Sequence, residues 1–265
     1  MWQKDVRKYF DLHDCRLWFA LMLLCLSEMP SAFAQGGPPM LTDDPGTPGA
    51  GAWELNVAYR EERTSQERLR SVPYFDINYG LGERVQLKYE TRWLLSDAAD
   101  GGGTQSGLDN SLFGVKWRFL DQDRNGVDMS VYPQLELENF TGSVSRGIAE
   151  PGPNLFLPFE IGRDFGKVKL VGELGYQYLH AQDNEWVVGV LGAVQASEKL
   201  EFLAEVRNTS DKLLNGGDVI GNVGVRQVLS PKLKLVASLG TGLNNRTDAT
   251  TFTTYVGVQM VLGKK

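Results

Sequence analysis

The sequence predicts an all-β protein, a transmembrane antiparallel up-and-down β-barrel of about 12 strands. Segments of roughly ten residues with two-residue alternation recur along the chain, their connections alternate between short and long, and aromatic residues gather near the segment ends. The alternation is clearest over 84–95, where Leu87 and Tyr89 fall on one face while Lys88, Glu90 and Arg92 fall on the other.

Composition is compatible with this fold and narrows the partners. The chain has 265 residues, 30 glycines and a formal net charge of -6, enough for one large all-β domain or two small ones. A pI near 5.1 argues against a nucleic-acid partner, because phosphate binding needs a clustered positive field. The two cysteines, Cys15 and Cys25, lie near the N-terminus, so we expect no cysteine-based site in the mature protein.

The N-terminus has the features of a secretory signal. Basic residues precede an apolar run over 17–26, and Ala32 and Ala34 have the spacing that signal peptidase reads. The run is too short for a membrane-spanning helix, and no later segment approaches about 18 uninterrupted apolar residues. Lipidation at Cys25 is the alternative, which Leu24 disfavours because a small residue should precede the cysteine.

These features divide the chain into three expected regions. They are a signal peptide over 1–34, a periplasmic N-terminal segment over 35–51 and an outer-membrane barrel over 52–265. The second region contains Thr42-Asp-Asp-Pro-Gly-Thr, which predicts a turn before the first strand. The alternative is a cation bound by Asp43 and Asp44, although no further oxygen ligands lie near in sequence.

The barrel region contains twelve segments with strand alternation, an even number as expected of a single-chain outer-membrane barrel. The predicted strands are 52–60, 71–80, 84–95, 108–120, 127–138, 154–163, 167–179, 185–196, 199–207, 218–229, 232–243 and 250–262.

The connections between these strands alternate in length. Four are very short, namely 81–83, 164–166, 197–198 and 230–231. The polar connections are 61–67, 96–105, 139–152, 180–184, 208–217 and 244–249. Such asymmetry is typical of barrels whose tight turns stay in the periplasm. A soluble β-sandwich, the alternative fold, has no reason to alternate in this way.

Aromatic residues are expected in two rings at the bilayer interfaces. The predicted periplasmic ring comprises Trp53, Tyr79, Trp117 and Phe119, and the outer ring comprises Trp93, Tyr176, Tyr178, Trp186 and Phe252. Ordinary core aromatics are the alternative interpretation.

Several turn and strand motifs resemble a known family. They are Thr42-Asp-Asp-Pro-Gly-Thr, Trp53-Glu-Leu-Asn, Asn78-Tyr-Gly-Leu-Gly and Ser111-Leu-Phe-Gly-Val-Lys-Trp-Arg. Together they resemble the outer-membrane β-barrel family labelled meta pathway of phenol degradation, often described as transporters, over nearly all of the chain from Leu41 onward. The resemblance implies a barrel and a transport function. The C-terminus departs from many outer-membrane barrels, because it ends in Leu262-Gly-Lys-Lys rather than in an aromatic residue.

The alternation places charges of both signs on the inward face. The candidate lumen residues are Lys88, Glu90, Arg92, Lys116, Arg118, Glu136, Glu173, Glu205, Arg207, Arg226 and Lys234, together with Glu160 and Lys169. They predict either a salt-bridged, mostly closed interior or a narrow channel in which Lys and Arg steer anionic solutes. Inward Tyr74, Tyr132 and Tyr255 would offer stacking faces.

Enzyme chemistry has one weak candidate, His180, the sole histidine after the predicted signal. Outer-membrane lipid hydrolases pair a histidine with a serine, and here the partner would have to be a residue distant in sequence, such as Ser143 or Ser210. A loop or girdle histidine is the simpler interpretation, so we predict that the protein is not an enzyme.

Metal and nucleotide motifs are also weak. The segment 121–126 matches the start of an EF-hand loop, but the twelfth position is Tyr132 instead of glutamate, and Asn125-Gly126 favours a turn. A different calcium loop that uses these aspartates stays open. No phosphate-binding glycine motif appears, so we expect neither a cofactor nor a resident metal.

The sequence therefore predicts a porin-like channel or transporter in the outer membrane of a Gram-negative bacterium. It would pass small, aromatic or anionic, molecules through a charged lumen. Its expected partners are outer-membrane lipid, a small-molecule solute and the barrel-insertion machinery. The alternatives are a closed structural or surface-recognition barrel that acts through its loops, and a lipid hydrolase that uses His180.

Overall fold

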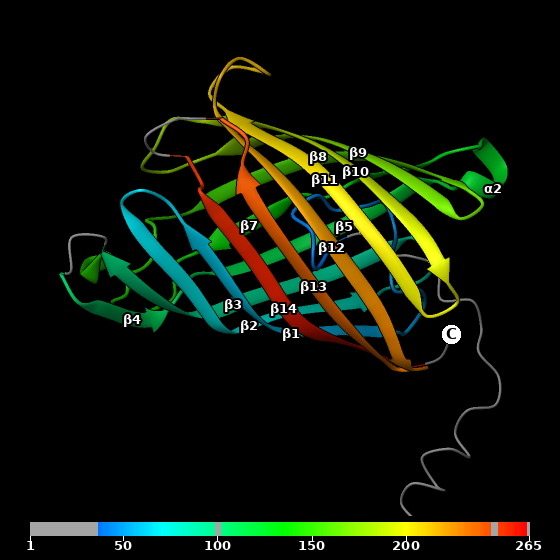
Figure 1. The fold of residues 1–265 in the computed structure, drawn as a ribbon, viewed down its shortest axis with the longest axis horizontal. Coiled ribbons are helices and arrows are strands. Elements are labelled where there is room, and N and C mark those ends of the chain that lie inside the picture. The colour runs from blue at the N-terminus through cyan, green and yellow to red at the C-terminus, as the bar shows by residue number, and fades with distance from the viewer. Residues whose placement is uncertain (1–36, 99–101, 245–248, 264–265) are drawn as a thin grey trace, which may run out of the picture. The chain divides into compact units, whose positions relative to one another are not determined.

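Antiparallel strands form nearly all of the barrel in the computed structural model, which describes residues 37–98, 102–244 and 249–263 (Figure 1). The predicted signal peptide lies outside the described residues. A short helix, α2 (Gln122–Asn125), and a 3-10 turn, η1 (Val144–Arg146), are the helical elements of the described part. The strands are β1 (Trp53–Arg63), β2 (Glu67–Gly80), β3 (Val85–Ala98), β4 (Thr104–Leu108), β5 (Ser111–Leu120), β6 (Asp128–Val131), β7 (Gln134–Leu137), β8 (Asn154–Phe165), β9 (Val168–Tyr178), β10 (Glu185–Ser197), β11 (Leu200–Ser210), β12 (Asp218–Ser230), β13 (Leu233–Gly242) and β14 (Phe252–Leu262).

The sheet closes on itself because its first strand pairs with its last. β1 pairs with β2 on one side and with β14 on the other, where Trp53 lies opposite Leu262. β4 and β5 both pair with β3, and β6 and β7 both pair with β8, so each of these pairs fills one position in the wall. The result is a closed antiparallel barrel of 12 strands, which confirms the predicted fold and excludes the β-sandwich.

Two predicted strands are interrupted. The sequence predicts continuous strands over 108–120 and 127–138, whereas the structure breaks the first at Asp109 and the second at Pro133. Proline has no N–H to donate to a neighbouring strand, which accounts for the second break. At the first break the Asp109 carboxylate forms an ion pair with Arg92 on β3. The alternation of apolar and polar residues alone predicts neither of these two strand interruptions.

The connections are short at one end of the barrel, called here the short-turn end, and mostly longer at the other, called the loop end. The turns 81–84, 166–167, 198–199 and 231–232 lie at the short-turn end. The connections 138–153, 179–184 and 211–217 lie at the loop end, as do the described residues 243–244 and 249–251. The β1–β2 hairpin differs from the predicted loop over 61–67, because Arg63 pairs with Arg68 and only 64–66 remain unpaired. At the short-turn end 121–127 holds α2, and Gly126 adopts a φ of 79°, as the turn interpretation predicts.

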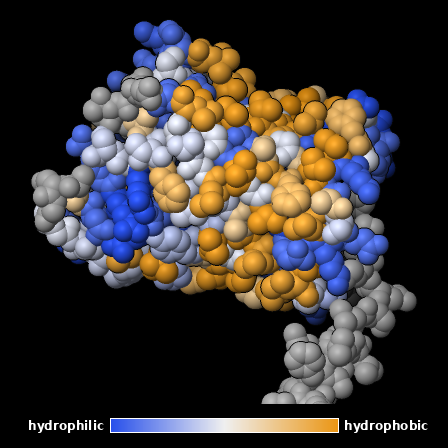
Figure 2. Space-filling view, viewed as in Figure 1, coloured by the Kyte–Doolittle hydropathy of each residue, from blue (hydrophilic) through white to orange (hydrophobic). Residues whose placement is uncertain are grey.

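The surface is inverted relative to that of a soluble protein. Outward side chains in mid-strand are apolar and exposed, such as Val190 at 59% and Phe202 at 53%, and Figure 2 shows an apolar zone between more hydrophilic ends. The most buried large side chains include Lys116, Gln259 and Glu160. Soluble proteins almost never bury such groups in preference to Val and Phe, whereas a barrel in lipid with a polar interior does. No helix in the described residues is long and apolar enough to cross a bilayer.

Aromatic rings cluster near both ends. At the short-turn end the ring centroids of Trp53 and Tyr79 lie 4.7 Å apart, and those of Trp117 and Phe119 lie 5.7 Å apart. Near the loop end Tyr176 lies 4.7 Å from Tyr178 and 4.8 Å from Trp186. The positions agree with the two predicted rings, which flank the apolar zone.

Candidate functional site

A stretch of irregular backbone, residues 37–51, lies inside the barrel and is called here the inner segment. The Leu41 and Thr42 amides donate to the two carboxylate oxygens of Glu205 on β11, at 2.9 and 2.8 Å. The Asp43 amide donates to Glu173 on β9 at 3.1 Å. This placement differs from the periplasmic segment expected over 35–51. The physical reason is that inward carboxylates supply acceptors for amides that have no strand partner.

Inward cations and a hydroxyl bind the carbonyls of the same segment. Arg207 donates to Leu41 O at 2.9 Å, and Arg226 donates to Gly37 O at 3.0 Å and to Pro38 O at 3.1 Å. The Ser238 hydroxyl donates to Pro39 O at 2.8 Å. Because proline supplies carbonyls without an N–H, this stretch needs donors from outside, and the guanidinium group offers several in fixed directions.

The two aspartates of the inner segment form ion pairs with lysines of the wall. Asp43 Oδ1 lies 3.0 Å from Lys116 Nζ, and Asp44 forms an ion pair with Lys169. Asp44 Oδ1 also accepts from the Gly46 amide at 2.8 Å, which forms the turn that the sequence predicts. Burial alone would raise the pKa of Asp44, but Lys169 and Lys116 outweigh it and lower that pKa to about 2. No cluster of three or more metal-ligating side chains exists in the described residues.

Glycines let the inner segment approach the wall closely. A Cβ at Gly189 on β10 would lie 2.4 Å from Thr42 Oγ1, and a Cβ at Gly80 would lie 1.7 Å from Gly49 O. Contacts this short cannot be kept, so a side chain at either position would force the inner segment to shift. At the short-turn end the Gly51 amide donates to Gly80 O at 2.9 Å. The segment therefore enters the barrel beside the β2–β3 hairpin and packs against β10.

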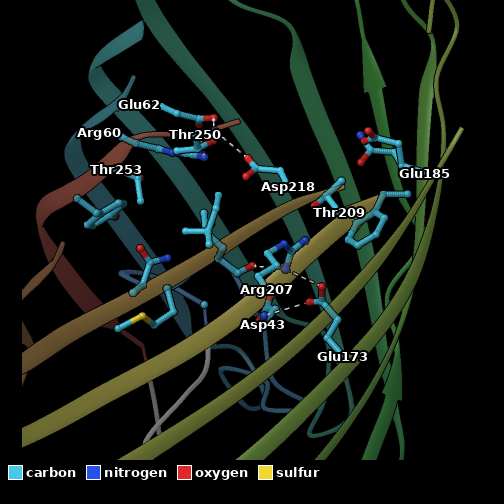
Figure 3. A pocket seen from close by; sticks show the side chains of 18 of the residues that line it. Asp43, Arg60, Glu62, Glu173, Glu185, Arg207, Thr209, Asp218, Thr250 and Thr253 are labelled. Carbon is cyan, nitrogen blue, oxygen red and sulfur yellow. Dashed lines mark hydrogen bonds and ion pairs between the residues drawn. The ribbon is translucent and has the colours of Figure 1, made fainter. Parts of the chain in front are cut away.

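Above the inner segment, toward the loop end, lies a cavity of about 1070 Å³, called here the upper cavity (Figure 3). Its charged lining consists of eight acids and three bases: Asp43, Glu62, Glu90, Glu173, Asp183, Glu185, Asp211, Asp218, Arg60, Lys88 and Arg207. Each base has an acidic neighbour, at 3.3 Å for Arg60–Glu62, 3.0 Å for Lys88–Glu90 and 2.7 Å for Arg207–Glu173. The cavity lining is therefore acidic on balance.

Loop residues fix the rim of the upper cavity. The Thr250 hydroxyl donates to Glu62 at 3.2 Å, and the Thr250 amide donates to Asp218 at 3.1 Å. Figure 3 shows these three residues side by side above Arg207 and Glu173. β1, β12 and the start of β14 are thus joined around the opening.

The predicted lumen residues fall into three groups. Lys88, Glu90, Glu173 and Arg207 line the upper cavity. Lys116, Glu205 and Arg226 bind the inner segment, as do Glu173 and Arg207, and Glu160 lies 3.3 Å from Lys116. Arg92, Arg118 and Glu136 interact instead with Asp109, with Asp121 and with Asn110 and Asn154, while Lys234 interacts electrostatically with Glu54.

Prediction from the sequence did not identify the acidic residues near the rim of the upper cavity, nor the inward acidic residues of β1 and β2. Asp183, Asp211 and the other rim acids fall in or beside predicted loops, where alternation assigns no face. Glu54 and Asp76 are buried on the inward face, and the alternation that placed Tyr74 inward could have identified Asp76. Tyr74 and Tyr255 line the upper cavity as predicted inward residues, whereas Tyr132 is fully buried beside Lys116.

The two serines that the enzyme hypothesis names as partners of His180 have other hydrogen-bond partners in the structure. The His180 amide donates to Asn154 at 2.9 Å. The Ser210 hydroxyl donates to Asn208 at 3.0 Å, and the Ser143 hydroxyl lies 2.9 Å from that of Thr141. Both serines are thus engaged with groups other than the His180 ring.

The first aspartate of the calcium-loop alternative is paired with arginine side chains. Asp121 forms ion pairs with Arg84 and Arg118, the latter at 3.1 Å, so its carboxylate is already neutralised.

Solved structures with the same fold are outer-membrane barrels. The chain is similar to the COG4313 outer membrane channel from Pseudomonas putida F1, with a TM-score of 0.63 and 15% identity over 89% of this chain and 100% of that one. It is similar to the NanC porin (TM-score 0.56, 9% identity, 78% and 98% covered) and to the KdgM porin (0.53, 12%, 78% and 99%). At these identities the likeness shows the fold. No protein-family model matches the sequence, and no curated protein matches it either.

Proposed function

We propose that the protein is a channel of the bacterial outer membrane that passes small molecules when the inner segment leaves its seat in the barrel. The observation that carries the proposal is the upper cavity of about 1070 Å³, which opens near the loops and ends on the inner segment. An apolar outer zone suits the barrel to lipid, and a polar interior suits it to water-soluble solutes. The short-turn end would face the periplasm.

The fold supports this proposal by analogy. The structures that share it at TM-scores above 0.5 are described as a channel and as porins. Because a fold hosts many functions, the cavity of this chain supports the proposal more directly than the likeness does.

The lining indicates which solutes would enter. Eight acids against three paired bases favour neutral or positively charged molecules over the anionic ones that the sequence also allowed. Tyr74, Phe156 and Tyr255 lie on the same lining and offer aromatic faces. A small neutral or cationic solute with an aromatic group fits this chemistry, and an aromatic solute accords with the resemblance to the phenol-degradation family.

A disulfide across the inner segment tests the proposal directly. A Cβ at Gly189 would lie 3.2 Å from Thr42 Cβ, near the separation that a disulfide requires. We expect the double variant Thr42→Cys with Gly189→Cys, in a background lacking Cys15 and Cys25, to lock the segment when oxidised. Liposomes that carry the reduced protein should swell in a small neutral solute such as phenyl glucoside, and oxidation should abolish the swelling.

The single variant Thr42→Cys is the matched control, because it cannot form the bond and should swell equally in both redox states. Absence of swelling in the reduced protein and in the wild type would leave the closed structural barrel as the better account, with its role in the loops. The observation in favour of that alternative is that two apolar loop residues, Phe140 and Leu214, are exposed.

A further inference from the structure

Charged residues at the loop end of β1 and β2 face outward, away from the upper cavity. Arg60 and Glu62 line that cavity, so strand alternation turns Glu61 and Arg63 to the outer surface. Arg63 lies directly opposite Arg68 on β2, and opposed residues share a face of the sheet. Figure 2 shows a strongly hydrophilic patch at the left of the apolar zone, where Figure 1 places the β1–β2 hairpin. The group called here the outer cluster comprises Glu61, Arg63, Arg68, Arg70 and Asp97.

Arginines already pair with both acids of the outer cluster. Glu61 accepts two hydrogen bonds from Arg68, at 2.8 and 2.9 Å, and forms a second ion pair with Arg63. Arg70 lies opposite Glu61 in the register and pairs with Asp97 on β3 at 2.6 Å. Asp97 in turn lies opposite Arg68, so it shares the outward face. Three guanidinium groups thus face two carboxylates, and the cluster carries one excess positive charge.

Burial differs between the carboxylate of Glu61 and its two cations. The side chain of Glu61 is 4% exposed, whereas those of Arg63 and Arg68 are 47% and 42% exposed. The carboxylate therefore lies beneath the guanidinium groups and orients them, because a bidentate pair fixes the plane of an arginine. Since a guanidinium group has five N–H donors, both arginines keep exposed surface that can bind a further acceptor.

The outer cluster lies at the height expected of lipid headgroups. β1 runs over 11 residues from Trp53 to Arg63. A rise of about 3.4 Å per residue and a tilt of about 40° place Arg63 roughly 25 Å above Trp53, which is the usual height of the apolar band of a barrel. Arg63 Cζ also lies 5.1 Å from the ring centroid of Phe252, a member of the predicted outer aromatic ring. The outward strand residues at the loop end of β8–β14 are uncharged, among them Tyr178, Trp186, Thr241 and Phe252.

We propose that the outer cluster binds a phosphate group of lipopolysaccharide, the phosphorylated glycolipid of the outer leaflet, with Arg63 and Arg68 as the direct donors. The planar fork of arginine matches phosphate, and basic clusters at this depth recognise lipid headgroups. Below the cluster the outward wall is apolar, as at Val57 and Phe75, which lie opposite each other. Acyl chains joined to the phosphate would therefore contact the same strands, which a free phosphate ion could not do. The inference rests on the proposed function in one respect, because it assumes an outer-membrane barrel whose loop end faces outward.

Lipid binding to the detergent-solubilised protein tests the proposal, with native mass spectrometry as the measure of bound lipid. We expect the wild type to bind bisphosphorylated lipid A at least about tenfold more tightly than dephosphorylated lipid A, since one hydrogen bond to a charged group is worth about that factor. The variant Glu61→Gln, Arg63→Gln, Arg68→Gln removes both donors together with the carboxylate that they cover, so no buried charge loses its partner. It should bind bisphosphorylated lipid A at least about tenfold more weakly than the wild type.

Arg163→Gln is the matched control, because Arg163 also lies over a phenylalanine ring, 4.9 Å from the centroid of Phe165, but at the short-turn end. It should leave the affinity for lipid A unchanged. Heat-modifiable gel mobility shows whether each variant folds. If the triple variant does not fold, Arg63→Lys with Arg68→Lys takes its place: it keeps both charges, loses the planar forks and should weaken binding at least about threefold.

Equal affinity of the wild type and the folded cluster variant for lipid A would overturn the inference, as would equal affinity of the wild type for phosphorylated and dephosphorylated lipid A. Displacement of lipid A by an equal concentration of phosphatidylglycerol would also overturn it, because the site would then select no particular lipid phosphate. The cluster variant should swell liposomes as the wild type does, since none of its altered residues lines the upper cavity. Failure of lipid binding is thereby distinguished from failure of the channel.

Discussion

The ion pair between Asp44 and Lys169 should control how firmly the inner segment is held, and Asp44→Asn tests this. Asp44 is 1% exposed, and its carboxylate also accepts from the Gly46 amide at 2.8 Å. Asparagine keeps the size and an acceptor for Gly46 but removes the charge that faces Lys169 and Lys116. The variant therefore perturbs the electrostatic attachment with little change in packing.

The lowered pKa sets the expected magnitude. Burial alone would raise the pKa of Asp44 above its ordinary 3.8, but the attraction of Lys169 and Lys116 outweighs this effect and lowers the pKa to about 2. At roughly 1.4 kcal/mol for each unit of pKa, this difference corresponds to about 2 kcal/mol in favour of the seated, ionised state. The contribution is fully present above the ordinary pKa and is lost as the pH falls through about 2. Without it, the population with a released segment should rise roughly 30-fold at neutral pH.

Thiol labelling can measure that population. Thr42 is fully buried, so a single cysteine in its place reacts with a maleimide only when the segment leaves its seat. In a background lacking Cys15 and Cys25, we expect Asp44→Asn to accelerate labelling roughly 30-fold. Asp123→Asn, on the exposed helix α2, is the control and should have no effect. Equal labelling rates for Asp44→Asn and Asp123→Asn would refute the assigned role of this ion pair.

Three further predictions follow from the same geometry. Lowering the pH from about 4 to about 2 should increase solute flux through the wild type in liposome assays but not through Asp44→Asn; equal pH responses would contradict the assignment. Gly189→Ala should loosen the segment and increase swelling, whereas Gly192→Ala, whose Cβ would meet its nearest neighbour at 3.7 Å, should not. Val190→Lys should destabilise the barrel by about 2–4 kcal/mol in lipid, as measured by urea unfolding, whereas Val190→Leu should be neutral.

The strands were predictable because the membrane barrel imposes a simple rule on each of them. Every second residue must suit lipid, so the alternation of Leu87 with Lys88 is repeated along the chain, and the predicted range 154–163 nearly matches β8 (Asn154–Phe165). The rule fails beyond the lipid zone. There the β1–β2 hairpin continues through polar residues such as Arg63 and Arg68, which pair by backbone bonds whatever their side chains.

The inner segment was not predictable from its own residues. Glycine and proline carry no periodicity, so Thr42-Asp-Asp-Pro-Gly-Thr indicates a turn but not its surroundings. The bonds that hold it come from residues far along the chain: Leu41 and Glu205 are 164 positions apart, and Gly37 and Arg226 are 189 apart.

Alternation assigns a residue to a face, whereas function depends on its depth and its neighbours. Lys88 and Lys116 are equivalent in the sequence pattern, since both are inward lysines of central strands. In the structure Lys116 is 1% exposed and pairs with Asp43 of the inner segment, while Lys88, on the neighbouring strand β3, pairs with Glu90 and lines the upper cavity. The inward charges therefore divide into two sets: one set holds the inner segment that closes the barrel, and the other lines the upper cavity that solutes would cross.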